Sequence, residues 1–309
     1  MPVLERASGA LSRLDERVRT SVVREGWIER MNFLDAQAAA WNAGELVQVE
    51  DLVLHDAFMD QQAPTPALIQ AARVLRARRL VAKHEPGWSW TREGLAHLLG
   101  RHSAADPHRA WREHADPRGL VYAVDHDEQA SLEAWLSLHL EVRGLPALCS
   151  AAFLLIAWRD LDPIERGGWL GPLLVADYLR QRQITTSHLP PLNHAFRLAG
   201  YRRMMSGEPT DEALEFITAL AVGAVDGERL HDRLSLARQL LARKLQGRRR
   251  TSRLGEAVGL SIGRPLVTVA LLAKELKVSK QGAQLIMKEI APAMREITGQ
   301  TSYRAWAIL

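Results

Sequence analysis

Apolar residues recur at helical spacing along almost the whole chain, and few segments show the alternation or the β-branched runs typical of strands. For example, Leu11, Leu14, Val18 and Val22 fall at positions i, i+3, i+7 and i+11. Aromatic residues make up only 6% of the 309 residues, whereas hydrophobic residues make up 47%. The pattern predicts a mainly α fold with at least one sizeable core.

Local signals indicate where several of these helices begin. Thr65 stands before a proline and Thr91 before an apolar-periodic run, so both are predicted N-caps. Thr210 is predicted to cap a long helix in the same way. A second long helix is expected over about residues 227–245, because leucine and alanine again form one stripe there.

Cysteine content and hydropathy indicate the cellular compartment in which the chain is expected to fold. The single cysteine, Cys149, excludes a disulfide framework and a Cys-rich zinc module, and it fits a reducing environment. The longest apolar stretch, residues 145–158, is shorter than the roughly twenty residues that span a bilayer. We therefore expect a buried core helix there, no membrane partner, and a soluble cytoplasmic protein.

The net charge of +4 hides an uneven distribution. Residues 229–309 contain sixteen Lys+Arg and five Asp+Glu, a balance of +11, whereas residues 1–228 have a balance of −7. A basic segment of this kind favours a polyanionic partner. A solvated helix face with a basic linker is the simpler alternative, so the motif inside the segment decides between them.

The basic segment contains the pattern of a helix-turn-helix. Thr268 can cap a helix over residues 269–276, and Ser279 can cap a second helix over residues 279–290 after a short turn at Lys277. In the second helix, Ala283 begins an apolar stripe that continues through Ile286, Met287 and Ile290. Two short helices joined in this way predict a DNA-binding motif with the second helix in the major groove.

The opposite stripe of the second helix carries the chemistry that reads bases. Lys280, Gln281, Gln284 and Lys288 occupy it; the first three lie in the half that enters the groove, and Lys288 is better placed for a phosphate. Lysine can donate to guanine O6 and N7, and glutamine can pair with adenine N6 and N7. The two capping residues, Thr268 and Ser279, lie at the edge of the same surface and are also predicted to contact DNA.

A β-hairpin is expected after this helix, with a Gly-containing turn at residues 298–301 and alternation over residues 303–308. The segment resembles winged helix-turn-helix domains, although position 277 is lysine where such turns often carry glycine. The remaining predicted DNA contacts lie on the wing and the preceding linker: Gln300, Thr301, Arg304, Arg248, Arg249 and Arg250. A helical domain that docks on another protein is the alternative interpretation.

The larger domain resembles Fic-domain proteins in residues 161–175, where Pro163, Gly167 and a following leucine-rich helix match the family signature. The resemblance implies a helical fold. The family's catalytic histidine is replaced by Asp162, which is ionised at pH 7 and cannot act as a base poised near neutrality. The phosphate-binding positions fall on Gly168 and its apolar neighbours, so nucleotidyl transfer is not expected.

A second resemblance concerns bacterial proteins that pair an uncharacterised helical domain with a C-terminal helix-turn-helix. It is carried by residues 176–193 and 295–309. The predicted organisation is thus a multi-helix Fic-like domain over residues 1–246, for dimerisation or sensing, and a small winged helix-turn-helix with a short β-hairpin over residues 247–309.

Other chemistry finds no support in the sequence, which has no phosphate-binding loop, dinucleotide fingerprint or zinc-protease motif. The histidines between residues 97 and 114 are spaced unsuitably for a helical metal site. We therefore expect no cofactor, no metal and no enzyme. The leading hypothesis is a double-stranded DNA-binding transcription regulator that acts as a homodimer with an unidentified effector. A residual Fic-type nucleotidyltransferase and a protein–protein adaptor are the alternatives.

Overall fold

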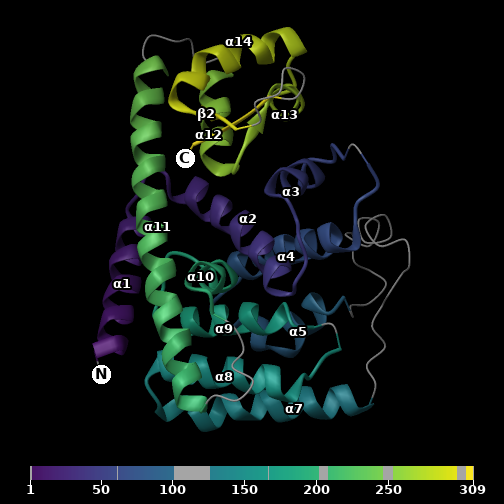
Figure 1. Cartoon of the computed structure of the whole chain (residues 1–309), viewed down its shortest axis with the longest axis vertical. Coiled ribbons are helices and arrows are strands. Elements are labelled where there is room, and N and C mark those ends of the chain that lie inside the picture. Colours follow the sequence, from purple (N-terminus) through teal and green to yellow (C-terminus); the bar gives the residue numbers. More distant parts are fainter. Residues whose placement is uncertain are drawn as a thin grey trace.

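The computed structural model describes residues 2–60, 62–100, 126–165, 167–201, 208–245, 253–297 and 304–308. Helices build nearly all of it, and a small three-stranded sheet lies near the C-terminus (Figure 1). The predicted fold class, mainly α with a short C-terminal hairpin, is confirmed.

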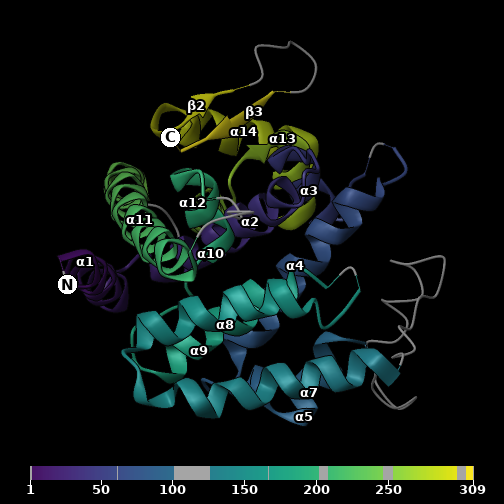
Figure 2. The same cartoon turned by 60° about the horizontal axis from the view of Figure 1, so that its bottom comes forward.

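The body of the molecule is built from α-helices. Within the described ranges they are α1 (Pro2–Arg19), α2 (Arg24–Asn42), α3 (Val49–Asp56), α4 (Pro66–Lys83), α5 (Arg92–Leu98), α7 (His126–Glu141), α8 (Ala147–Leu161), α9 (Leu170–Gln181), α10 (Leu192–Ala199) and α11 (Pro209–Leu245). Helices α7, α8 and α9 lie at one end of the molecule, and α11 runs beside α1 towards the other end (Figures 1 and 2). Among the helices that the structure describes, none is both long and apolar enough to cross a membrane.

The predicted caps of two body helices are confirmed. Thr65 accepts a hydrogen bond from the amide of Leu68, and Thr91 accepts one from the amide of Gly94. The stripe predicted to end at Val22 is wrong in its last residue. Helix α1 ends at Arg19, and Val22 is 87% exposed in the turn that leads into α2.

The prediction of two helices over residues 210–245 is also wrong, because α11 is continuous from Pro209 to Leu245. Residue 227, where the second helix is expected to begin, lies inside α11, and Gly227 serves close packing. A Cβ atom there would lie 2.9 Å from the side chain of Leu14, and the indole of Trp27 donates to the Gly227 carbonyl at 3.0 Å. The glycine is required by a tertiary contact rather than by a helix end.

Most of the apolar stretch at residues 145–158 lies in α8, and this part is largely buried, as predicted. Trp158 is 1% exposed and meets Trp135 edge-on, with ring centroids 4.8 Å apart. Trp135 also stacks on Trp90, whose indole donates to the Leu174 carbonyl. These tryptophans are packing residues of the core.

The C-terminal part has the order of a winged helix. Its elements are α12 (Leu254–Gly263), β1 (Val267–Thr268), α13 (Val269–Glu275), α14 (Lys280–Ile290), a 3-10 helix (Ala291–Ala293), β2 (Arg295–Glu296) and β3 (Ala305–Ala307). The strands are antiparallel in the order β1–β3–β2, with Trp306 opposite both Val267 and Glu296. The sequence predicted α13, α14 and the hairpin, but α12 and β1 were missed.

Candidate nucleic-acid interface

The turn between α13 and α14 is fixed by local hydrogen bonds. Thr268 accepts from the Leu271 amide and Ser279 from the Gly282 amide, so both predicted residues act as N-caps with their hydroxyl groups already engaged. Between the helices, Lys277 adopts a left-handed conformation with φ of +52°. Its amide and the next one bond back to α13 carbonyls, which is a Schellman arrangement that glycine normally occupies.

Helix α14 has one buried side and one exposed side. Ala283, Met287 and Ile290 are at most 3% exposed and hold the helix against the domain core, as predicted. The predicted reading stripe, Lys280, Gln281, Gln284 and Lys288, is exposed throughout. None of these four side chains bonds to another residue in the described part of the chain, and α14 lies at the outer end of the molecule (Figure 1).

A residue missed in the sequence lies on the same exposed side. Leu285 is 64% exposed and stands between Gln281, Gln284 and Lys288 on the helix surface. An exposed leucine among polar side chains suits contact with the 5-methyl group of thymine. The signal was present, because the helical spacing places Leu285 off the apolar stripe.

The wing contributes one described residue to the predicted set. Arg304 is exposed and lies 3.4 Å from the carboxylate of Glu296 on the neighbouring strand. The other predicted contacts on the wing and the linker lie outside the described residues: Gln300, Thr301, Arg248, Arg249 and Arg250.

The opposite side of the winged helix is joined to the body by a buried arginine. Arg30 of α2 is 4% exposed and donates to the main-chain carbonyls of Ser261, Ile262, Arg264 and Ile308. Among the described residues these carbonyls are its only hydrogen-bond partners. Burial lowers the pKa of Arg30 to about 9, so the side chain stays charged at neutral pH at the negative end of α12.

A second group of charges lies beside this contact. The guanidinium groups of Arg79 and Arg264 both bind the carboxylates of Glu29 and Asp56, and both lie over the ring of Phe33. Burial raises the pKa of Asp56, but the bonds from Arg79 and Arg264 outweigh it and hold the pKa below its usual value. Arg264 comes from the C-terminal part, so this network also spans the junction.

Apolar packing continues across the junction. Leu266, Leu271 and Ala305 are buried in the same cluster as Phe33 and Leu52 of the body. In addition, Lys274 of α13 donates to the carbonyls at the end of α3. The winged helix therefore sits on the body through shared core residues, and its reading stripe faces away from that contact. The boundary predicted at 246/247 lies outside the described residues.

Buried polar groups in the body serve its own packing. Arg78 pairs with Asp35 at 2.8 Å, both almost fully buried. Asp15 accepts bonds from Thr186 and Ser187, which, with its contact to His188, overcome the effect of burial and lower its pKa. Burial lowers the pKa of His188. Arg78 also donates to the Leu189 carbonyl, so these contacts join the segment after α9 to α1 and α4, and α4 to α2.

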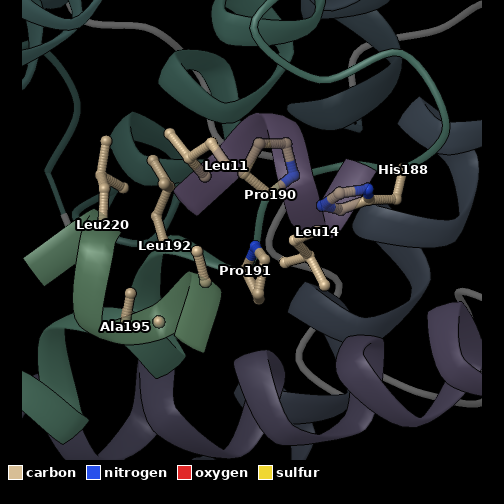
Figure 3. A pocket seen from close by; sticks show the side chains of 10 residues that line it. Leu11, Leu14, His188, Pro190, Pro191, Leu192, Ala195 and Leu220 are labelled. Carbon is tan, nitrogen blue, oxygen red and sulfur yellow. The ribbon is translucent and has the colours of Figure 1, made fainter. Parts of the chain in front are cut away.

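The cavity beside His188 is too small for an effector. It measures about 10 Å³, and its lining is almost entirely leucine, proline and small residues (Figure 3). That space holds at most one water molecule. The described residues also contain no group of three His, Cys, Asp or Glu side chains that could hold a metal ion.

The segment that resembles the Fic signature forms the loop between α8 and α9. Asp162 is exposed and ends α8 in a left-handed conformation, with φ of +39°. Gly167 is buried against Ile164, and the ring of Trp169 lies 5.0 Å beneath the guanidinium of Arg73. The Fic-like character of the body stays a prediction.

Two families of known sequences match segments of this chain. Residues 120–246 match the family described as "Protein of unknown function (DUF1612)", and residues 254–309 match the family described as "HTH DNA binding domain". "Uncharacterized protein y4cF" of Sinorhizobium fredii (strain NBRC 101917 / NGR234) is 36% identical over 371 aligned residues, covering 100% of this chain and 96% of the relative. The predicted pairing of a helical domain of unknown function with a C-terminal helix-turn-helix is confirmed.

Proposed function

The chain belongs to the same family as the Sinorhizobium fredii protein and carries a helix-turn-helix DNA-binding domain, and from this premise we propose that it is a sequence-specific transcription regulator. Helix α14 enters the major groove of double-stranded DNA. The stripe of Lys280, Gln281, Gln284 and Lys288 reads base edges or phosphates there.

The observation that carries this proposal is the exposure of the whole stripe at the outer end of the molecule. Its donors and acceptors form no hydrogen bond within the described part of the chain, so they are available to bases. Because Ser279 caps α14, the N-terminal half that carries Lys280 and Gln284 is held in a defined orientation.

The basic C-terminal segment supplies the sequence-independent part of the affinity. Lysine and arginine side chains that neutralise phosphates release counterions, so the logarithm of affinity falls with the logarithm of salt concentration. We expect a steep salt dependence for the whole chain. It is measured by gel shift from low to physiological salt, and a flat response would contradict phosphate binding.

Two copies are needed for useful specificity. One recognition helix contacts only a few base pairs, and a homodimer on paired half-sites doubles that number. The helical body is the part that brings the two copies together.

Lys280→Ala and Gln284→Ala test the reading helix directly. DNA first selected from a random pool by the wild-type protein is used in gel shifts with each variant. Each lost base contact should weaken binding by about 1–3 kcal/mol, roughly 5- to 150-fold, and relax the preference at one base pair. The control is Lys83→Ala, which removes an exposed lysine of the body. Unchanged affinity and preference in both reading-helix variants would remove α14 from the interface.

We also propose that the body is not an enzyme. Where the Fic signature has its catalytic histidine and its phosphate-binding residues, the α8–α9 loop has an exposed carboxylate at Asp162 and uncharged residues at Gly168 and Trp169. Incubation with labelled ATP tests this. Label transfer that Asp162→Ala abolishes would establish an enzyme instead.

A further inference from the structure

Helix α11 has a second regular face, which the rest of the described chain leaves open. Its inner face is buried against α1, α8 and α10. On its outer face lies a series of nine residues that follow one another at alternating spacings of three and four, and all nine are exposed. These positions are Glu215, Thr218, Val222, Val225, Arg229, Asp232, Leu236, Gln239 and Arg243.

This spacing is the heptad seam of a coiled coil. Val222, Val225 and Leu236 on the seam are 38%, 37% and 58% exposed, and Leu240 at its edge is 44% exposed. Helix α11 runs along one side of the molecule, and α1 packs beside it over part of its length (Figures 1 and 2). Three of the nine seam positions are thus aliphatic and the other six are polar or charged, so this helix of 37 residues presents a mixed face on which both apolar contacts and ion pairs can form.

We propose that this face binds the same face of a second copy of the chain, with the two α11 helices antiparallel. The two-fold axis passes between positions 230 and 231. In that register Val225 of each copy lies opposite Leu236 of the other, and Arg229 lies opposite Asp232. Each contact occurs twice, as an isologous interface requires.

The charges on the seam select the antiparallel orientation. A parallel pair in register would place Arg229 against Arg229 and Asp232 against Asp232, which is repulsive. The antiparallel pair puts opposite charges at both positions and brings the end with Glu215 towards the end with Arg243. Asp232 is available, because its carboxylate is 66% exposed even though it binds Arg17 at 2.8 Å.

This interface supplies the dimer of the proposed function, but it rests on the α11 face and not on DNA binding. The two therefore fail separately. A dimer that binds no DNA would remove the proposed function and leave the interface, whereas a monomer that binds DNA would remove the interface and leave the DNA-binding role of α14.

The mass in solution is the first test. The full chain is expected at twice its mass of 34.5 kDa by light scattering at about 10–100 µM, a range in which weak specific pairs associate. Leu236→Asp and Val225→Asp should each give monomers with unchanged circular dichroism. Leu46→Asp is the matched control, since Leu46 is 77% exposed but lies outside α11.

Disulfide cross-linking tests the register in a Cys149→Ser background. Val225→Cys combined with Leu236→Cys should cross-link two chains under oxidation. Neither substitution alone should do so, because copies of one position lie about 16 Å apart along the antiparallel pair. A monomeric wild type, a dimer that survives both aspartate variants, or cross-linking by a single cysteine would each overturn the proposal.

Discussion

The two sides of the winged helix use charged and polar side chains in opposite ways. On the inner side, Arg30 of the body is 4% exposed and donates to carbonyls of α12 and to that of Ile308, which follows the last strand. On the outer side, Lys280 and Gln284 are exposed and bind no described residue. The inner groups determine how the domain is oriented on the body, and the outer groups are free to determine what it binds.

This difference separates stability from recognition. A buried charge that satisfies several carbonyls contributes to folding, because its removal leaves those carbonyls without partners. An exposed side chain contributes little to folding and can be exchanged with little effect on it. Substitutions on the inner side should therefore change the unfolding free energy, whereas shortening a side chain to alanine on the outer side should change mainly DNA binding.

The largest effect is expected from Arg30→Met. Methionine fills much of the same space but cannot donate, so the carbonyls of Ser261, Ile262, Arg264 and Ile308 lose their shared donor. The unfolding free energy should fall by about 3–5 kcal/mol. Urea unfolding followed by circular dichroism measures it.

Arg13→Met is the matched control. The Arg13 side chain is 65% exposed and lies 3.5 Å from Glu228, so its loss should change stability by less than about 1 kcal/mol. Equal effects in the two variants would show that the inner side is no more stabilising than the surface.

Lowering the pH is expected to reduce the unfolding free energy by a smaller amount, through the carboxylate of Asp56 in the junction. Its pKa is lower in the folded chain than in the unfolded one, so its contribution is complete above the unfolded value and disappears as the pH falls through the folded one. Asp56→Asn removes that contribution. The wild type should lose more stability between about pH 5 and pH 3 than this variant. If the unfolding free energies of the wild type and of Asp56→Asn fell in parallel over this pH range, the Asp56 carboxylate would contribute nothing to the junction.

Local sequence rules predicted much of the reading surface. Thr268 and Ser279 could be identified as caps because their bonds reach only three residues along the chain. The exposed stripe of α14 followed from helical periodicity alone. Even the unusual turn residue, Lys277, was recognised from the turn geometry, and the structure gives it the left-handed conformation expected for glycine.

The junction could not be predicted, because its contacts join residues far apart in the chain. Arg30 and the carbonyl of Ile308 are separated by 278 positions. Nothing local distinguishes Arg30 from an exposed arginine, and nothing local reveals that Gly227 packs on Leu14 instead of starting a helix. Periodicity indicates which face of a helix is apolar, but not which distant element covers it.

On the outer side, Leu285 is expected to contribute specificity without contributing stability. Contact with the thymine methyl group is worth about 1 kcal/mol, so replacing thymine by uracil in the selected DNA should weaken wild-type binding several-fold. Leu285→Ala should bind the two DNAs equally and unfold at the wild-type urea concentration. An alanine variant that still discriminates them would exclude Leu285 from the groove.

The smallest change in unfolding free energy is expected at Lys277, in the turn between α13 and α14. A lysine with φ of +52° is strained, and glycine adopts this conformation readily, so Lys277→Gly should stabilise the chain by about 0.5–1 kcal/mol. The same exchange inside α14, Lys288→Gly, should destabilise it by about 1 kcal/mol, because glycine disfavours a helix interior. Urea unfolding of both variants shows whether the two exchanges change the unfolding free energy in opposite directions. A loss of stability at both positions would mean that the lysine side chain itself supports the turn.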